Sequence, residues 1–480
     1  MRKGLIKSYW TGVTDFRNGE KYGKILRYFF PEFITALVLY SLLYLLDAAF
    51  VAHLKSTSMY ATLGITNTML HFIVKFAEGI SVGTIVLCGR FNGAGKQKDV
   101  GESLTNSFWI TVLSGLAISS LLYFGAYWIY YFYRVPADMI ELGVPFLRLR
   151  ALGIFFMFIY FSFIGFMRGI KNTKTPMKIF SIGAIFFIFF DYVLIFGEFG
   201  FPKMGLQGSA TASVIQYGVM LLLAGWTVFT RQKYKKYGIQ LFAIFRSLSK
   251  VTTLLKLSWP VMLDKSTMAL AYIWLGAMIA PMGKYALASF AVVKDLERFA
   301  FLPAVAFAQI ITLLVSNDFG RQNWTGIKTN IKKIIFMASI MVFSILLIIS
   351  IWPCYFVRFF DKKGDFTALS AQVIPILSVL VFFDLLQLIL SGAMRGSANV
   401  KMVMVTRLLV CLGYFAPVSY ILSQIDFGSQ ALKFILIYGS FYVGSAIMSL
   451  IYIRCFRSSE WQKQNAVSVI LNKFKFSKRI

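Results

Sequence analysis

The chain has 480 residues, of which 58% are hydrophobic and only 14% are charged, and its mean hydropathy is +0.70. A soluble domain cannot bury so large an apolar fraction, so this composition excludes a water-soluble globular protein. The formal net charge is +29. Because the Lys and Arg residues gather at the chain ends and in alternate segments between apolar runs, the charge argues against a nucleic-acid-binding surface.

Long apolar runs recur along the whole chain. A helix rises about 1.5 Å per residue, so roughly 20 residues cross a hydrocarbon core about 30 Å thick. Lipid requires every backbone polar group to be paired internally, which favours helices. In chain order the sequence predicts twelve transmembrane helices, over residues 28–52, 62–88, 106–131, 144–167, 177–197, 207–230, 252–280, 285–315, 331–357, 371–394, 401–423 and 431–454.

Basic residues set the expected orientation. They are concentrated in the amino-terminal segment, the loops after every second helix and the carboxy-terminal tail. By the positive-inside rule these parts face the cytoplasm, so both termini are predicted to be cytoplasmic and the number of spans even. We expect an integral protein of a bacterial-type inner membrane.

The two halves of the chain repeat each other. Gly165-Phe166-Met167-Arg168-Gly169 recurs as Gly392-Ala393-Met394-Arg395-Gly396, 227 residues later, and Pro31 corresponds to Pro260. Because each half holds an even number of helices, the two should be related by a pseudo-two-fold axis along the membrane normal. The predicted parts are an N-terminal segment 1–27, a six-helix lobe 28–230, a basic linker 231–251, a second six-helix lobe 252–454 and a basic tail 455–480.

Acidic residues inside the apolar runs are the main candidates for function, because a charge in the bilayer needs a partner, a cavity or a role. Asp47 and Asp191 fall at similar depth in the first and fifth predicted helices, neither of which offers a neutralising basic residue. A proton or a sodium ion is therefore the expected counter-charge. Asp384, in the tenth helix, could couple a cation or bind a cationic substrate, and Asp264 could be structural or functional.

Other buried charges are predicted to neutralise one another. Lys75 stands three residues before Glu78, and Asp295 stands three before Arg298. Such pairs share a helix face and are more often structural. The four cysteines are scattered without the spacing of a metal site or a disulfide framework.

Several stretches together resemble the multidrug and toxic compound extrusion (MATE) family, within the multidrug/oligosaccharidyl-lipid/polysaccharide flippase superfamily. The likeness runs over nearly the whole chain. It is carried by Pro31 with Leu46 to Val51, Gly93-Ala94-Gly95, Met167-Arg168-Gly169 with Asn172 to Met177, Asp191 to Gly197, Gly205 to Ala210, Glu297 with Pro303, and Asp384 to Gln387 with Met394-Arg395-Gly396.

The resemblance implies an antiporter that exports cationic drugs in exchange for protons or sodium. It implies that Asp47 and Asp191 couple the ion, with Asp384 as the corresponding residue of another subgroup. Candidate substrate-binding residues are Asp384, Gln387, Glu297 and Asp264. The resemblance also implies that no cofactor is needed, and we expect a functional monomer whose partners are small cationic molecules and the lipid bilayer.

Two positions depart from the family pattern. Met268 stands where the family has a helix 7 glutamate, and Phe187 stands where it often has an Asn one turn before Asp191. Sodium needs several oxygen ligands whereas a proton needs one carboxylate, so the departure at Phe187 favours proton coupling.

Two other classes of function compete with an antiporter. A membrane enzyme would need a catalytic His or a metal site, and His53 and His71 have no carboxylate or Cys at catalytic spacing. A flippase or exporter of a lipid-linked or anionic molecule remains an alternative, because Lys75, Lys265, Lys294, Arg298 and Arg407 could face a cavity.

Overall fold

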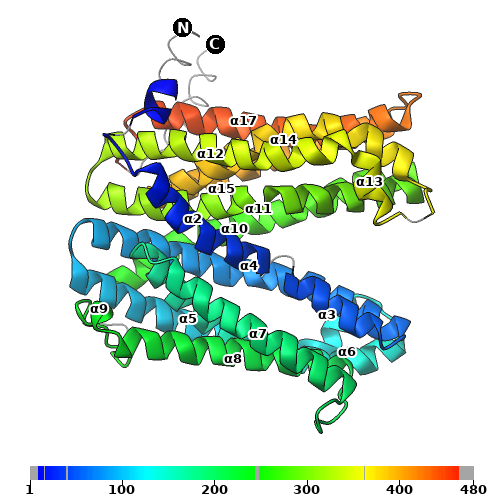
Figure 1. Ribbon diagram of the computed structural model, residues 1–480, viewed down its shortest axis with the longest axis horizontal. Helices are drawn as coiled ribbons and strands as arrows, with labels where there is room; N and C mark the ends of the chain where they lie inside the picture. Colours follow the sequence, from blue (N-terminus) through cyan, green and yellow to red (C-terminus); the bar gives the residue numbers. More distant parts are fainter. Residues whose placement is uncertain (1–8, 16, 39–41, 244–247, 362, 464–480) are drawn as a thin grey trace. The chain divides into compact units, whose positions relative to one another are not determined.

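The structure is a computed structural model that describes residues 9–463 except 16, 39–41, 244–247 and 362. Within these ranges the regular structure is entirely helical (Figure 1). The helices are α2 Tyr22–Leu37, α3 Leu43–Ala52, α4 Thr57–Gly93, α5 Gln97–Phe132, α6 Ala137–Gly169, α7 Lys174–Phe196, α8 Leu206–Thr230, α9 Gln232–Lys235, α10 Leu248–Ile279, α11 Lys284–Gly320, α12 Trp324–Ile351, α13 Pro353–Arg358, α14 Thr367–Gly396, α15 Val400–Val410, α16 Ala416–Gln424 and α17 Gln430–Arg457.

The predicted all-helical membrane architecture is confirmed. Among the described residues, ten helical stretches are long and apolar enough to cross a membrane. The remaining two predicted spans correspond to α2 with α3 and to the 32-residue α10.

Two predicted spans are interrupted. The ninth was expected to run through 331–357, but α12 ends at Ile351 and α13 begins at Pro353. Pro353 has no N–H to continue the hydrogen-bond ladder, and Trp352 before it leaves the helical conformation (φ −122°, ψ 52°). The eleventh passes through a π-helical turn, Cys411–Phe415, two residues before Pro417.

The chain divides into two compact units. The N-unit is Phe30–Met262, and the C-unit is Leu263–Ile480 with Met1–Phe29. The division therefore falls inside α10 and not in the predicted linker 231–251. The described part of that linker belongs to the N-unit because α5 holds it: the Trp109 Nε1–H donates to the carbonyl of Leu241 (2.7 Å) and the Thr105 hydroxyl to that of Gln240 (3.2 Å).

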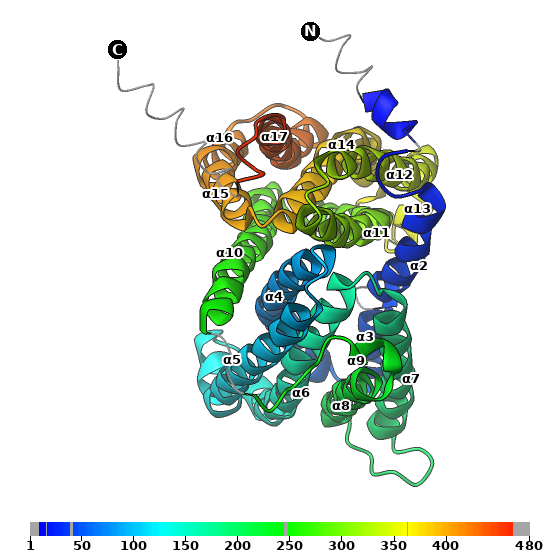
Figure 2. The same ribbon diagram turned by 90° about the vertical axis from the view of Figure 1, so that its left-hand side faces the viewer.

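Corresponding helices contact one another in the two units. In the N-unit α6 packs against α4, α5 and α8, and in the C-unit α14 packs against α11, α12 and α17 (Figure 2). In the predicted order of spans, the fourth helix of each half therefore contacts the second, third and sixth. This agreement supports the duplication inferred from sequence.

The repeated glycines explain the close packing of α6 on α4. A Cβ atom at Gly165 would lie 2.8 Å from the carbonyl oxygen of Ser81, and one at Gly169 would lie 3.1 Å from that of Ile85. Only glycine allows the two backbones to approach this closely, as in other small-xxx-small helix contacts in membranes.

The C-unit repeats these contacts between α14 and α11. A Cβ atom at Gly392 would lie 2.8 Å from the carbonyl oxygen of Ala308, and one at Gly396 would lie 2.7 Å from that of Thr312. Both the glycines and the carbonyls they meet stand 227 residues after their N-unit counterparts. The offset found in the sequence is thus an offset between equivalent packing contacts.

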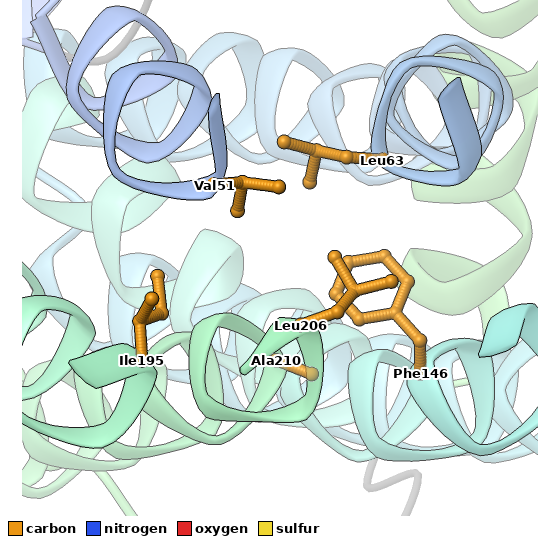
Figure 3. Close-up of a cluster of buried hydrophobic side chains, with 6 residues drawn as sticks. All are labelled: Val51, Leu63, Phe146, Ile195, Leu206 and Ala210. Atoms are coloured by element: carbon orange, nitrogen blue, oxygen red, sulfur yellow. The ribbon is translucent and has the colours of Figure 1, made fainter. Parts of the chain in front are cut away.

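An apolar cluster packs the helix ends one turn beyond Asp47 and Asp191. Val51, Leu63, Phe146, Ile195, Leu206 and Ala210 converge from α3, α4, α6, α7 and α8 (Figure 3). Each of these side chains is at most 3% exposed. Because lipid is as apolar as these side chains, the cluster stabilises the unit by close packing and not by exclusion from water.

The predicted tail 455–480 is described only to Lys463. Trp461 is fully buried and its ring packs against those of Trp324 and Phe456.

Candidate functional site

Asp47 lies in α3 and is held from two other helices of the N-unit. The Ser209 hydroxyl of α8 donates to its Oδ1 (2.6 Å), and the Arg150 guanidinium of α6 donates to its Oδ2 (3.0 Å). The side chain is buried. Asp47 therefore has a cationic partner inside the protein.

This ion pair corrects an inference from sequence. No basic residue of helices 1 or 5 pairs with Asp47 among the described residues, but α6 supplies one, so Asp47 does not depend on a proton or a sodium ion for its counter-charge. Arg150 was missed as a site residue. The available signal was Arg148-Leu149-Arg150 inside the predicted span 144–167, where a buried basic residue calls for a carboxylate.

Arg150 is fixed by more than Asp47. Its guanidinium also donates to the hydroxyls of Ser209 (3.1 Å) and Ser213, one turn apart on α8. Its charged carbon lies 5.2 Å from the centre of the Phe146 ring. Three polar partners and an aromatic face hold the side chain in one position.

Asp191 has a contrasting environment. It lies in α7, is fully buried, and neither carboxylate oxygen has a hydrogen-bond partner among the described residues. It interacts electrostatically with Asp47 and Arg150. An ionised carboxylate in this position would be costly, so the group needs a proton or another cation.

A small cavity adjoins Asp47 and Arg150. Its volume is about 60 Å³, and its lining includes Asp47, Asn67, Arg150, Phe187 and Gln216. Drug-sized ligands need pockets of about 300–1,000 Å³, whereas a water molecule occupies about 30 Å³ in the liquid. The cavity has room for an ion or a few water molecules.

The predicted acids of the C-unit also come together. Asp384 of α14 accepts a hydrogen bond from Ser445 (3.0 Å), and Glu297 of α11 accepts one from Tyr438 (2.5 Å), both donors belonging to α17. The two carboxylates interact electrostatically, and Gln387 is buried one turn after Asp384. Among the described residues, the groups that donate these hydrogen bonds are thus hydroxyls and not cations.

Asp264 lies in a different environment. Arg395 donates to its Oδ2 (2.5 Å) and Arg407 to its Oδ1, so each oxygen has an arginine. Met268, at the position of the family's helix 7 glutamate, presents its sulfur to Arg407 (3.0 Å). The proposed substrate-binding role of Asp264 stays a prediction, and its geometry is that of a structural ion pair.

Arg168, the N-unit counterpart of Arg395, also contacts a carboxylate. Its Nε and terminal nitrogen donate to the two oxygens of Glu32 at 2.8 and 2.6 Å. The repeated arginine thus contacts an acid on the first helix of each half, Glu32 in one and Asp264 in the other. The predicted Lys75–Glu78 pair is also confirmed, at 3.1 Å.

Comparison with known proteins identifies the family. The MatE family model matches residues 33–193 and 260–421. A probable multidrug resistance protein NorM from Thermotoga maritima is 23% identical over 390 residues, which cover 80% of this chain and 82% of that protein. A probable multidrug resistance protein YoeA from Bacillus subtilis is 24% identical over 363 residues, covering 74% and 77%.

Solved structures share the fold at low identity. A MATE crystal structure in a bent conformation has a TM-score of 0.82 at 19% identity and covers 92% of this chain and 96% of that one. A MOP superfamily transporter from Pyrococcus furiosus, described as having a binding pocket of reversed polarity, has a TM-score of 0.81 at 18% identity and covers 90% and 94%. The two matched segments of the family model fall one in each half of this chain and together span most of it. The chain therefore belongs to the MatE family of membrane transporters.

Proposed function

We propose that the chain is a secondary active antiporter that exports organic cations from the cytoplasm in exchange for protons by alternating access. The observation that carries this proposal is Asp191, a fully buried carboxylate that has no hydrogen-bond partner among the described residues and lies one turn after Phe187, which lines an ion-sized cavity. A group in such a site gains or loses a cation when access to water changes. The names of the relatives as multidrug resistance proteins support an export function.

The cargo site is proposed to lie among the acids of the C-unit. Asp384 and Glu297 are buried carboxylates that accept hydrogen bonds from hydroxyl groups, and Gln387 is buried one turn after Asp384. These groups can accept a cationic molecule by exchanging a proton for it. The protein is proposed to act as a monomer in an inner membrane with both termini cytoplasmic, without a cofactor.

One observation favours a second candidate, an exporter or flippase of an anionic or lipid-linked molecule. Arg150, Arg395 and Arg407 place three guanidinium groups inside the two units. Each contacts a carboxylate, which reduces the attraction for an anionic cargo. We therefore rank this candidate second.

The test is efflux of a fluorescent organic cation from proteoliposomes, driven by a pH gradient alone or by a sodium gradient alone. We expect efflux with the pH gradient and a loss of at least tenfold in Asp191→Asn and in Asp384→Asn. The matched control is Arg148→Gln, because Arg148 lies two residues from Arg150 but, within the described part of the chain, donates to the backbone of Tyr123 and not to an acid. If correctly inserted protein moves no cation under either gradient, the second candidate replaces the first.

A further inference from the structure

The N-unit site contains two carboxyl groups and one guanidinium group. Asp47 comes from α3, Arg150 from α6 and Asp191 from α7. The three interact electrostatically, yet only Asp47 has an ion pair with Arg150. Arg150 therefore forms an ion pair with Asp47 and not with Asp191.

The pairing with Asp47 is the one that the helices enforce. Ser209 and Ser213 lie one turn apart on α8, and both accept hydrogen bonds from Arg150. Ser209 also donates to Asp47, so acid, base and hydroxyl form a closed network across three helices. Moving Arg150 onto Asp191 would break these contacts, which is a strong reason for the pair to persist.

Few other groups could neutralise Asp191. Among the described residues, the charged groups that interact electrostatically with Asp191 are Asp47 from α3 and Arg150 from α6. The cavity that Phe187 lines adds two titratable groups, Tyr44 from α3 and Tyr217 from α8. Only Arg150 among them is cationic, and Asp47 already shares its charge. With both acids ionised the site would hold a buried net charge of −1, which one monovalent cation removes.

The surroundings favour a proton as that cation. Hard metal cations are bound by several oxygen ligands. Phe187 is the residue one turn before Asp191 and lines the cavity, and the carboxylate of Asp191 has no hydroxyl or amide within hydrogen-bond distance among the described residues. A proton needs only the carboxylate itself.

We propose that Arg150 is the permanent counter-charge of Asp47, leaving Asp191 as the single carboxyl group of this site that takes up and releases a proton. Arg150 acts as a positioning residue that limits this site to one exchangeable charge. The inference rests on the proposed antiport and specifies how many ions the N-unit exchanges.

The test is infrared difference spectroscopy of purified protein in detergent, which reports the carbonyl stretch of protonated carboxylic acids at neutral against alkaline pH. We expect Asp191→Asn to lose one such band. Arg150→Gln should gain one, because Asp47 would then need a proton too, and Arg150→Gln/Asp47→Asn should lose that additional band. Arg148→Gln, on the same helix, should match the wild type.

Two results would overturn the assignment: an unchanged spectrum in Asp191→Asn, or no additional band in Arg150→Gln. If Arg150→Gln does not fold, the double variant replaces it and must keep the Asp191 band, since the paired charges have been removed together. Cation efflux of the same proteins separates this inference from the antiport. If the wild type shows no efflux but the spectra are as expected, the antiport alone is refuted. If the wild type shows normal efflux but the band survives in Asp191→Asn, the assignment alone is refuted.

Discussion

The buried acids differ in the kind of partner that each one contacts. Asp47 and Asp264 contact arginines, whereas Asp384 contacts a serine hydroxyl and Asp191 has no hydrogen-bond partner among the described residues. A carboxylate paired with arginine is stabilised in its ionised form. Asp191 and Asp384 are thus better suited to exchange a proton than the two acids paired with arginine.

Removing one member of the Asp47–Arg150 pair should be worse than removing both. Asp47→Asn leaves Arg150 without the carboxylate that it contacts, and breaking a buried pair costs up to about 3–5 kcal/mol. In Asp47→Asn/Arg150→Gln no such charge remains. We expect the single variant to melt at a lower temperature in detergent than the double variant.

The control for this comparison is Arg150→Lys. It keeps the positive charge but loses the fork that contacts Asp47, Ser209 and Ser213, so its stability should lie between those of Asp47→Asn and the wild type. Equal melting temperatures for the single and double Asp47 variants would show that leaving Arg150 without its carboxylate costs no stability, which would contradict this prediction.

Asp361 provides a pH-dependent contribution outside the membrane spans. Desolvation opposes its ionisation, but hydrogen bonds from Thr367 (2.7 Å) and the amides of Phe366 (2.8 Å) and Gly364 (2.9 Å) outweigh it and hold the pKa of Asp361 below its ordinary value of 3.8. The stabilisation is therefore complete above that value and is lost as the pH falls through the lower pKa of the folded state.

Asp361→Asn should reduce thermal stability at neutral pH, and the difference from wild type should shrink under acid conditions. Asp365→Asn, four residues later and exposed, is the matched control and should change little at any pH. A stability difference that is constant from neutral to acid pH would contradict an ionised Asp361 as the stabilising species.

At the scale of helices, the sequence predicted positions well and interruptions poorly. Hydropathy locates spans because lipid selects for long apolar runs. It does not register Pro353 or the π-helical turn before Pro417, whose effect is on backbone hydrogen bonds. The acids were visible as charges in apolar runs, whereas the partnership of Asp47 with Arg150 depends on how α3, α6 and α8 pack, which sequence alone did not reveal.

One contact between α7 and α8 supports the N-unit site directly. A Cβ atom at Gly208 would lie 2.7 Å from the backbone carbonyl of Leu194, and the next residue is Ser209, which donates to Asp47. Gly208→Ala should force the helices apart, costing about 1–3 kcal/mol. We expect a lower melting temperature and weaker cation efflux.

Gly225→Ala is the control on the same helix, because a Cβ atom there meets nothing within 4 Å. It should leave stability unchanged or slightly improved, since alanine favours helix over glycine. If both variants behave alike, close approach of α7 and α8 is not what Gly208 provides.

Across the whole molecule, the two units repeat their packing but differ in charge. The glycine contacts of α6 and α14 keep the 227-residue offset, yet Arg168 contacts one carboxylate, Glu32, while Asp264 contacts two arginines, Arg395 and Arg407. Duplication therefore preserved the close helix contacts, and the charged groups placed on that common framework differ between the halves.

This difference predicts unequal effects for equivalent substitutions. Glu32→Gln withdraws a carboxylate from one arginine, whereas Asp264→Asn withdraws it from two that are both buried. Since each buried cation that loses its counter-charge is costly, Asp264→Asn should lower the melting temperature in detergent clearly more than Glu32→Gln. Glu198→Gln, at an exposed acid, should have no effect. Equal losses in Glu32→Gln and Asp264→Asn would mean that Arg407 does not need Asp264 as its counter-charge, which would contradict this prediction.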